Sequence, residues 1–208
     1  MPITMEKLAN GEHALIVCIG DSITEQNYHL HGKLNYVGQL TERLMEQYGR
    51  RSMVVNAGKS GHTTVELLGR LERDALRFKP DLVMVMIGMN DSARVTIDDF
   101  RQNLQTIIHH IESSGSEVLL LTQNMLDYNI VEGAVALRKD YPEYTAVIRE
   151  VAADTGTPLC DLCAEWAAHV NGNTNTHLML MNDSIHPNEH GHKLMAFALY
   201  KYLGIAAE

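Results

Sequence analysis

Hydrophobic residues gather in short unbroken runs, separated by longer segments in which apolar positions recur at helical spacing. The runs cover Ala14–Ile19, Ser52–Val55, Leu82–Ile87, Val118–Leu121 and Thr157–Cys160. Short, continuous aliphatic runs are typical of strands that are buried on both faces of a parallel sheet. The pattern therefore predicts five strands.

The segments between these runs predict helices, because their apolar residues recur every three or four positions. The expected helices are Tyr36–Tyr48, Val65–Phe78, Ile97–Ser113, Ala134–Asp154 with a break at Pro142, Asp161–Val170 and Glu189–Leu203, with a turn at Asn171–Thr176. Strands and helices that alternate in this way predict one parallel sheet covered by helices on both faces. We expect residues 1–208 to form a single α/β domain.

The first strand leads into Gly20-Asp21-Ser22, which places a serine just beyond the carboxyl end of the strand. Open α/β sheets bind ligands at this edge. Ser22 has two interpretations: a residue that caps a helix N-terminus, or a nucleophile held on a tight turn. The rest of the chain favours the nucleophile.

Three other segments carry polar residues in corresponding places. Ser60-Gly61 and Asn90-Asp91 follow the second and third strands, and Asp183 and His186 precede the last helix. Because the carboxyl ends of parallel strands share one edge, the sequence predicts that these groups meet near Ser22.

Acyl transfer requires this set of groups. A serine hydroxyl needs a base, usually histidine, and the histidine needs an acceptor that fixes its tautomer. The developing oxyanion needs preorganised donors, and the Ser22 N–H, the Gly61 N–H and the Asn90 amide are suited to this. At Gly61 a side chain would crowd the substrate.

These blocks resemble those of the SGNH hydrolases, also called the GDSL-type esterase family. Gly20-Asp21-Ser22 is similar to the first block, Asn56–Thr63 to the second, Gly88-Met89-Asn90-Asp91 to the third, and Asp183-Ser184-Ile185-His186-Pro187 to the last. The four blocks stand in family order and span most of the chain.

The resemblance implies a three-layer α/β/α sandwich with a flavodoxin-like, five-stranded parallel sheet, and a site without a metal or other cofactor. It implies Ser22 as nucleophile, His186 as base and Asp183 as its partner, with Ser22, Gly61 and Asn90 as oxyanion donors. We expect Asp21, Asp91 and Met89 to support the site or contact substrate. Ile23 and His62 depart from the family pattern, and His62 leaves the polarity beside Gly61 open.

Composition narrows the range of partners. The net charge of −9 disfavours nucleic acid or an anionic membrane surface as the main partner. The amino terminus shows no signal peptide and no run long enough to span a membrane, although a removed signal stays open. The three cysteines do not suggest a disulfide framework, so the expected compartment is the cytoplasm. The oligomeric state is left open.

The 11 histidines raise the alternative of a metal site. His186 and His190 have helical ligand spacing, and His29 and His31 lie in the polar loop 25–35. However, Pro187 disfavours a helix through both positions, and no nearby cysteine completes a site. We therefore expect no metal.

Two classes of function remain, an esterase and a non-catalytic binding module that keeps the fold. A binding module would be expected to have lost a triad residue, and none is missing. Within the esterase class, the absence of a long apolar lid and the polar loop 26–31 favour short-chain esters, such as acetyl esters, of carbohydrates or other small molecules. The alternative is a lipid ester or thioester.

Overall fold

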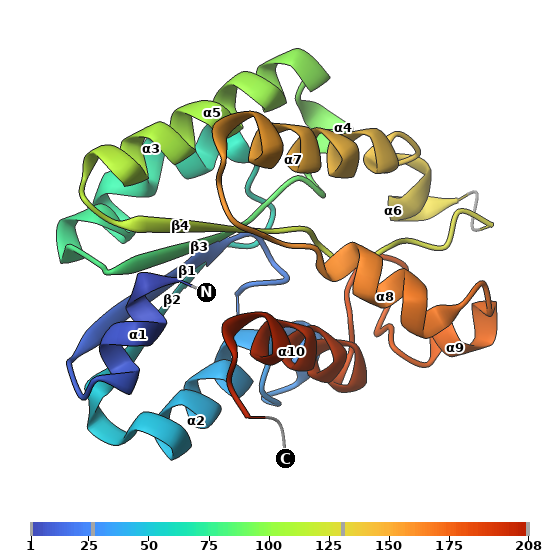
Figure 1. Ribbon diagram of the computed structural model, residues 1–208. Helices are drawn as coiled ribbons and strands as arrows, with labels where there is room; N and C mark the ends of the chain where they lie inside the picture. The colour runs from blue at the N-terminus through green and yellow to red at the C-terminus, as the bar shows by residue number, and fades with distance from the viewer. Residues whose placement is uncertain (1, 26–27, 130–131, 207–208) are drawn as a thin grey trace.

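A five-stranded parallel sheet forms the centre of the protein, as the sequence predicts (Figure 1). The computed structural model describes residues 2–25, 28–129 and 132–206. The strands are β1 (Ala14–Gly20), β2 (Ser52–Gly58), β3 (Leu82–Met86), β4 (Glu117–Leu121) and β5 (Leu159–Cys160). They lie side by side in the order β2-β1-β3-β4-β5, and every pair is parallel. This order confirms the expected flavodoxin-like, five-stranded parallel sheet.

Helices cover both faces of the sheet. On one face lie α2 (Tyr36–Tyr48), α8 (Leu162–Val170) and α10 (Glu189–Leu203), and on the other α3 (Thr64–Asp74), α5 (Ile97–Ser113) and α7 (Tyr141–Thr155) (Figure 1). The shorter helices are α1 (Ile3–Ala9), α4 (Asp91–Arg94), α6 (Gly133–Ala136) and α9 (Thr174–Leu178), with 3₁₀ turns η1 (Tyr28–Leu30), η2 (Gly49–Arg51) and η3 (Leu76–Phe78).

Three helices, α2, α5 and α10, have the predicted bounds, and each begins after a side-chain cap. Asn35, Thr96 and Asn188 accept hydrogen bonds from the free N–H groups of the first turn. Such a cap fixes where the helix starts, and the apolar period fixes how far it continues.

Other expectations need correction. The helix predicted over Val65–Phe78 ends at Asp74 and continues only as η3. The turn expected at 171–176 contains the start of α9, whose cap is Asn173. Pro142 lies in the first turn of α7, so the break falls before the proline, where its missing N–H costs nothing. The hydrophobic pattern predicts neither α1 nor α4.

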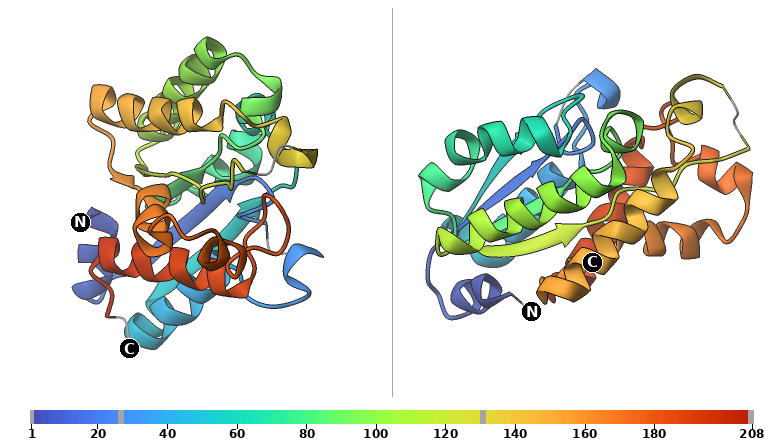
Figure 2. Two further views of the ribbon diagram at one scale, coloured as in Figure 1. Left: turned by 90° about the vertical axis from the view of Figure 1, so that its right-hand side faces the viewer. Right: turned by 90° about the horizontal axis from the view of Figure 1, so that it is seen from above.

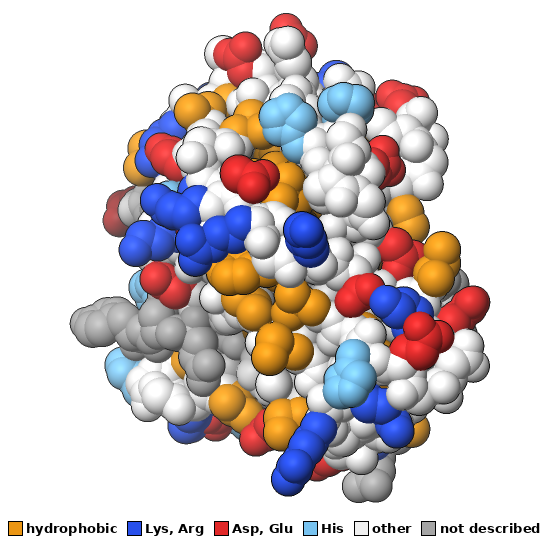
Figure 3. All heavy atoms as spheres, turned by 90° about the vertical axis from the view of Figure 1, so that its left-hand side faces the viewer, with side chains coloured by type: hydrophobic (Ala, Val, Ile, Leu, Met, Phe, Trp, Pro, Cys, Tyr) orange, Lys and Arg blue, Asp and Glu red, His pale blue; other side chains and the backbone are white. Residues whose placement is uncertain are grey.

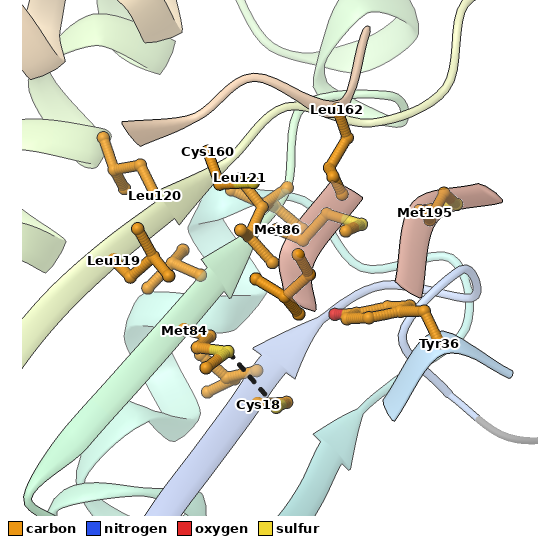
Figure 4. Packing of buried hydrophobic residues seen from close by; sticks show 14 of the residues in the cluster. Cys18, Tyr36, Met84, Met86, Leu119, Leu120, Leu121, Cys160, Leu162 and Met195 are labelled. Carbon is orange, nitrogen blue, oxygen red and sulfur yellow. Dashed lines mark hydrogen bonds between the residues drawn. The ribbon is translucent and has the colours of Figure 1, made fainter. Parts of the chain in front are cut away.

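Buried side chains from the sheet and both helical layers form one core. Figure 4 shows Cys18 of β1 and Met84 of β3 side by side, with their sulfur atoms 3.9 Å apart. Tyr36 of α2 and Met195 of α10 cover the same face. Cys18 and Cys160 are buried as free thiols, as expected for cysteines that serve as small core residues.

The amino-terminal edge of the sheet is closed by α1. Glu117 accepts hydrogen bonds from the N–H groups of Ile3 and Thr4, and Lys7 pairs with Asp81 at 2.5 Å. Figure 3 views the molecule from this side, where charged groups of both signs surround exposed hydrophobic side chains. The predicted chemistry lies at the opposite edge.

The strands approach one another very closely at the carboxyl-terminal edge. Gly20, at the end of β1, is level with Gly58 of β2 and Met86 of β3. A Cβ at Gly20 would lie 2.3 Å from the Met86 carbonyl oxygen, so only glycine fits. Figure 2 (left) faces this edge, and the loops that follow the strands gather there.

Candidate active site

Ser22 lies in a tight turn directly after β1. The Asp21 carbonyl accepts hydrogen bonds from the N–H groups of Thr24 and Glu25. The next regular element after this turn in the described chain is η1, so Ser22 does not cap a helix. The turn presents the serine at the sheet edge, in keeping with the nucleophile interpretation.

Serine, histidine and aspartate form one hydrogen-bonded series. Ser22 Oγ lies 3.0 Å from His186 Nε2, and His186 Nδ1 lies 2.8 Å from Asp183 Oδ2. These residues are 164 positions apart at the first link but only three apart at the second. The structure thus brings the three predicted triad residues together in the predicted order.

A small closed loop carries Asp183 and His186. Met181 and Pro187 form an antiparallel bridge at its base, and the Asn182 N–H donates to the His186 carbonyl at 2.8 Å. The Asn188 side chain donates to the carbonyl of Met181 while capping α10. The loop is therefore held in shape largely by its own backbone.

The loop also packs tightly against α10. A Cβ at Gly191 would lie 2.4 Å from the Leu180 carbonyl oxygen and 2.7 Å from the Trp166 ring. Only glycine permits this approach, which seats the loop on the body of the protein.

Electrostatics at Asp183 favour the carboxylate. Partial burial opposes ionisation, but hydrogen bonds from the His186 ring and from the N–H groups of Ile185 and His186 outweigh it. The pKa of Asp183 is therefore held well below its usual range. A carboxylate has no proton to donate, so His186 Nδ1 carries the hydrogen and Nε2 is left to accept from Ser22.

A second histidine, from η1, covers the ring of His186. The rings of His29 and His186 are stacked with centroids 3.6 Å apart, and His29 Nδ1 lies 3.7 Å from Asp183 Oδ2. Burial and the neighbouring His186 lower the pKa of His29, which favours its neutral form. The polar loop was expected near the site, but this stacking was not, and residues 26–27 of the loop lie outside the described residues.

Gly61 and Asn90 follow β2 and β3 and lie beside the same turn. Gly61 has a φ of +77°, which favours glycine, and its carbonyl accepts from Arg94. A Cβ at Gly61 would meet no protein atom within 4 Å. Backbone conformation, rather than crowding by the protein, therefore accounts for the glycine.

Asn90 is buried and connects the second block to the first. Its Nδ2 donates to the His62 carbonyl at 3.1 Å and to Asp21 Oδ2 at 3.4 Å. The second contact is at the long limit of a hydrogen bond, so an incoming oxyanion would compete with it most easily.

His62 itself is structural. Its Nδ1 accepts from Arg70 Nε at 3.1 Å, and burial together with Arg70 lowers the pKa of His62, so the ring is neutral near pH 7. Arg70 is buried and also donates to the carbonyls of Gly20 and Ala57. This arginine therefore ties the ends of β1 and β2 to the second block.

Asp21, Asp91 and Met89 are all buried beside the site. Asp21 accepts from the N–H of Ile23 and from Gln123 Nε2, and burial raises its pKa. These surroundings are in keeping with the supporting part of the predicted role, and contact with substrate stays a prediction.

Within the part of the chain that the structure describes, one group of side chains could hold a metal ion. Potential ligand atoms of His29, Asp183 and His186 lie within 4.8 Å of one another. However, the two imidazole planes are nearly parallel, at 16°, so their lone pairs run side by side instead of converging on one point. His190 lies in α10, whereas His186 precedes it, so the helical ligand pair does not form.

A parallel α/β sheet with a serine–histidine–aspartate series at its carboxyl edge defines a serine hydrolase type of site. Comparison with known proteins agrees. The pattern of the GDSL-like lipase/acylhydrolase family matches residues 18–194. The chain belongs to this family, which confirms the resemblance seen in the sequence, and it is a carboxylic ester hydrolase.

Several of the similar proteins are esterases. An acetylxylan esterase of Geobacillus stearothermophilus is 28% identical over 220 residues, covering 95% of this chain and 96% of the relative. Esterase TesA of Pseudomonas aeruginosa is 30% identical over 178 residues, covering 83% and 79%. A solved α/β hydrolase from the metagenome of Lake Arreo is 27% identical with a TM-score of 0.79, covering 95% and 98%.

No helix among the described residues is both long enough and apolar enough to cross a membrane.

Proposed function

We propose that this protein is a serine esterase that removes short acyl groups, acetyl above all, from esters of carbohydrates or similar small molecules. The observation that carries the proposal is the continuous series from Ser22 Oγ through His186 to Asp183, at 3.0 and 2.8 Å. Similarity to an acetylxylan esterase over 95% of the chain supports the acetyl and carbohydrate parts.

The geometry suggests each step. His186 Nε2 takes the proton of Ser22 Oγ as this oxygen attacks the ester carbonyl, and Asp183 steadies the imidazolium. The N–H groups of Ser22, Gly61 and Asn90 stabilise the oxyanion. The imidazolium then gives its proton to the departing alkoxide, and the acyl-enzyme forms. A water molecule, with His186 as its base, then attacks the acyl-enzyme. The imidazolium returns the proton to Ser22 Oγ as the carboxylic acid is released.

Release of p-nitrophenol from its acetate, with labelling by a fluorophosphonate, tests the proposal. Ser22→Ala removes the attacking atom, so kcat should fall on the order of 10⁵–10⁶-fold and labelling should disappear. Ser113→Ala, an exposed serine at the end of α5, serves as the matched control and should behave like the parent. Equal activity of the Ser22→Ala protein and the parent would refute the proposal.

A second candidate, hydrolysis of longer acyl chains, has one observation in its favour. A cavity of about 290 Å³ is lined partly by Met125, Leu126, Tyr128 and Val170, in the loop after β4 and at the end of α8. A series of p-nitrophenyl esters from acetate to decanoate separates the two candidates. Higher kcat/KM on acetate and on acetylated xylo-oligosaccharides supports the first, and higher kcat/KM on decanoate supports the second.

A further inference from the structure

Arg138 reaches the predicted oxyanion site from a distant part of the chain. It follows α6 and is 48 residues from Asn90. Its Nη2 donates to Asn90 Oδ1 at 2.9 Å, its Nε to the Met89 carbonyl at 3.0 Å, and its Nη1 to the Ala134 carbonyl at 2.8 Å. The guanidinium is thus held by a carbonyl of its own segment and donates two further hydrogen bonds to the third block, at Met89 and Asn90.

This contact decides which way the Asn90 amide faces. An amide can turn about its last bond and exchange its oxygen and nitrogen, but a guanidinium has donors only. The atom that faces Arg138 must therefore be the oxygen. The nitrogen then faces the His62 carbonyl and Asp21, which are both acceptors. Neighbours on both sides of the amide agree on one orientation.

The same contact strengthens the donor. A charge-assisted hydrogen bond to the amide oxygen draws electron density from the nitrogen, so the N–H groups become better donors. An oxyanion hole depends on donors that are already oriented when charge develops. Without Arg138, only the His62 carbonyl and the long contact to Asp21 would oppose a turn of the Asn90 amide that presents its oxygen to the oxyanion and repels it.

We infer that Arg138 is a positioning residue, which locks the Asn90 amide with its N–H groups toward the reacting carbonyl oxygen. The inference rests on the proposed function for its kinetic consequence, but the orientation of the amide can be measured without any activity. A merely structural Arg138, which only tethers the segment after α6, would affect stability and leave the turnover of each folded enzyme unchanged.

The kinetic test is a double-mutant cycle of Arg138→Met and Asn90→Ala on p-nitrophenyl acetate, with active sites counted by fluorophosphonate. Arg138→Met should lower kcat about 10- to 100-fold and change KM less than about threefold. It should cost almost nothing further in the Asn90→Ala background. Arg138→Lys keeps the charge but not the fork, so it should recover part of the loss. Arg101→Met, which removes an arginine paired with Glu150, is the matched control.

The structural test uses the side-chain NH₂ signals of Asn90 in ¹⁵N-labelled protein, identified by their loss in Asn90→Ala. These signals should shift strongly in Arg138→Met, shift less in Arg138→Lys, and stay in place in Arg101→Met. Unshifted signals, or an equal loss of kcat with and without Asn90, would overturn the inference. If the Arg138→Met protein does not fold, Arg138→Lys carries both measurements. Failure of the proposed function would appear instead as unchanged activity in Ser22→Ala.

Discussion

The two halves of the site are built by different means. The half that holds Ser22, Gly61 and Asn90 depends on buried contacts between loops far apart in the sequence, such as Gln123 to Asp21, 102 residues away. The half that holds Asp183 and His186 is one loop with local hydrogen bonds, and the Asp183 side chain is 41% exposed.

This difference decides in which half of the site a substitution can change activity without changing the stability of the fold. Removing the partner of a buried polar group costs the desolvation energy of the group left behind, whereas an exposed group forms a hydrogen bond to water instead. Changes in the Asp183 loop should therefore affect catalysis alone. Changes around Asn90 should affect catalysis and folding together.

Among the changes that separate the two halves of the site, the largest effect is expected for Asp183→Asn. The amide preserves the shape of the loop but favours the wrong tautomer of His186, so kcat should fall on the order of 10⁴-fold. The free energy of unfolding should change by less than about 1 kcal/mol, because the side chain is partly exposed. Kinetics and urea unfolding on one preparation check both. A large loss of stability would show that this loop is not independent of the core.

Asn90→Ala comes next. Loss of one oxyanion donor should lower kcat about 10²–10³-fold, or roughly 2.7–4 kcal/mol. Unlike Asp183→Asn, it should also cost about 1–3 kcal/mol of stability, because Arg138 and the His62 carbonyl lose their partner. The exposed Asn175→Ala is the control. Parental kcat in the folded fraction would remove Asn90 from the site.

Asp91→Asn tests the buried half through pH. Burial raises the pKa of Asp91 to about 6 despite two hydrogen bonds from Thr64, and its Oδ2 has no partner among the described residues. Between the ordinary value of 3.8 and about 6 the folded state binds more protons than the unfolded state. The parent therefore loses stability as pH rises through this window, and full ionisation costs about 3 kcal/mol.

Asp91→Asn has no ionisable group at this position, so it lacks this loss of stability at higher pH. The free energy of unfolding of Asp91→Asn minus that of the parent should therefore be about 2 kcal/mol larger at pH 7.5 than at pH 4.5, which means a relative gain in stability at the higher pH. Urea unfolding at the two pH values measures the difference, with the exposed Asp98→Asn as control. The same difference in both variants would mean that Asp91 is ionised normally.

The smallest effect is expected for His29→Phe. The phenyl ring keeps the stacking on His186, so kcat/KM at pH 8 should fall less than about tenfold. Because the pKa of His29 is lowered, the residue is neutral above its ordinary value of about 6.5. The pH profiles of parent and variant, each divided by its own value at pH 8, should therefore overlay above that pH. A displaced profile in that range would show that His29 titrates with the triad.

The sequence by itself determined the alternation of strands and helices and the bounds of α2, α5 and α10, because local period and side-chain caps encode them. It also predicted the meeting of Ser22, Gly61, Asn90, Asp183 and His186, since loops that leave parallel strands share an edge. The roles of these residues stay predictions. Short helices such as α1, α4 and α9 were not predicted, because one or two turns of helix contain too few residues to show a hydrophobic period.

Only the tertiary structure decided what surrounds those residues. The local sequence does not predict that Arg138 contacts Asn90 or that His29 stacks on His186. The hydrophobic pattern around each residue indicates only its own local secondary structure. The burial of Asp21 and Asp91 likewise became visible only in the folded chain. Local pattern fixes secondary structure, whereas the partners of a polar side chain depend on which distant segments the fold brings within about 3 Å of it.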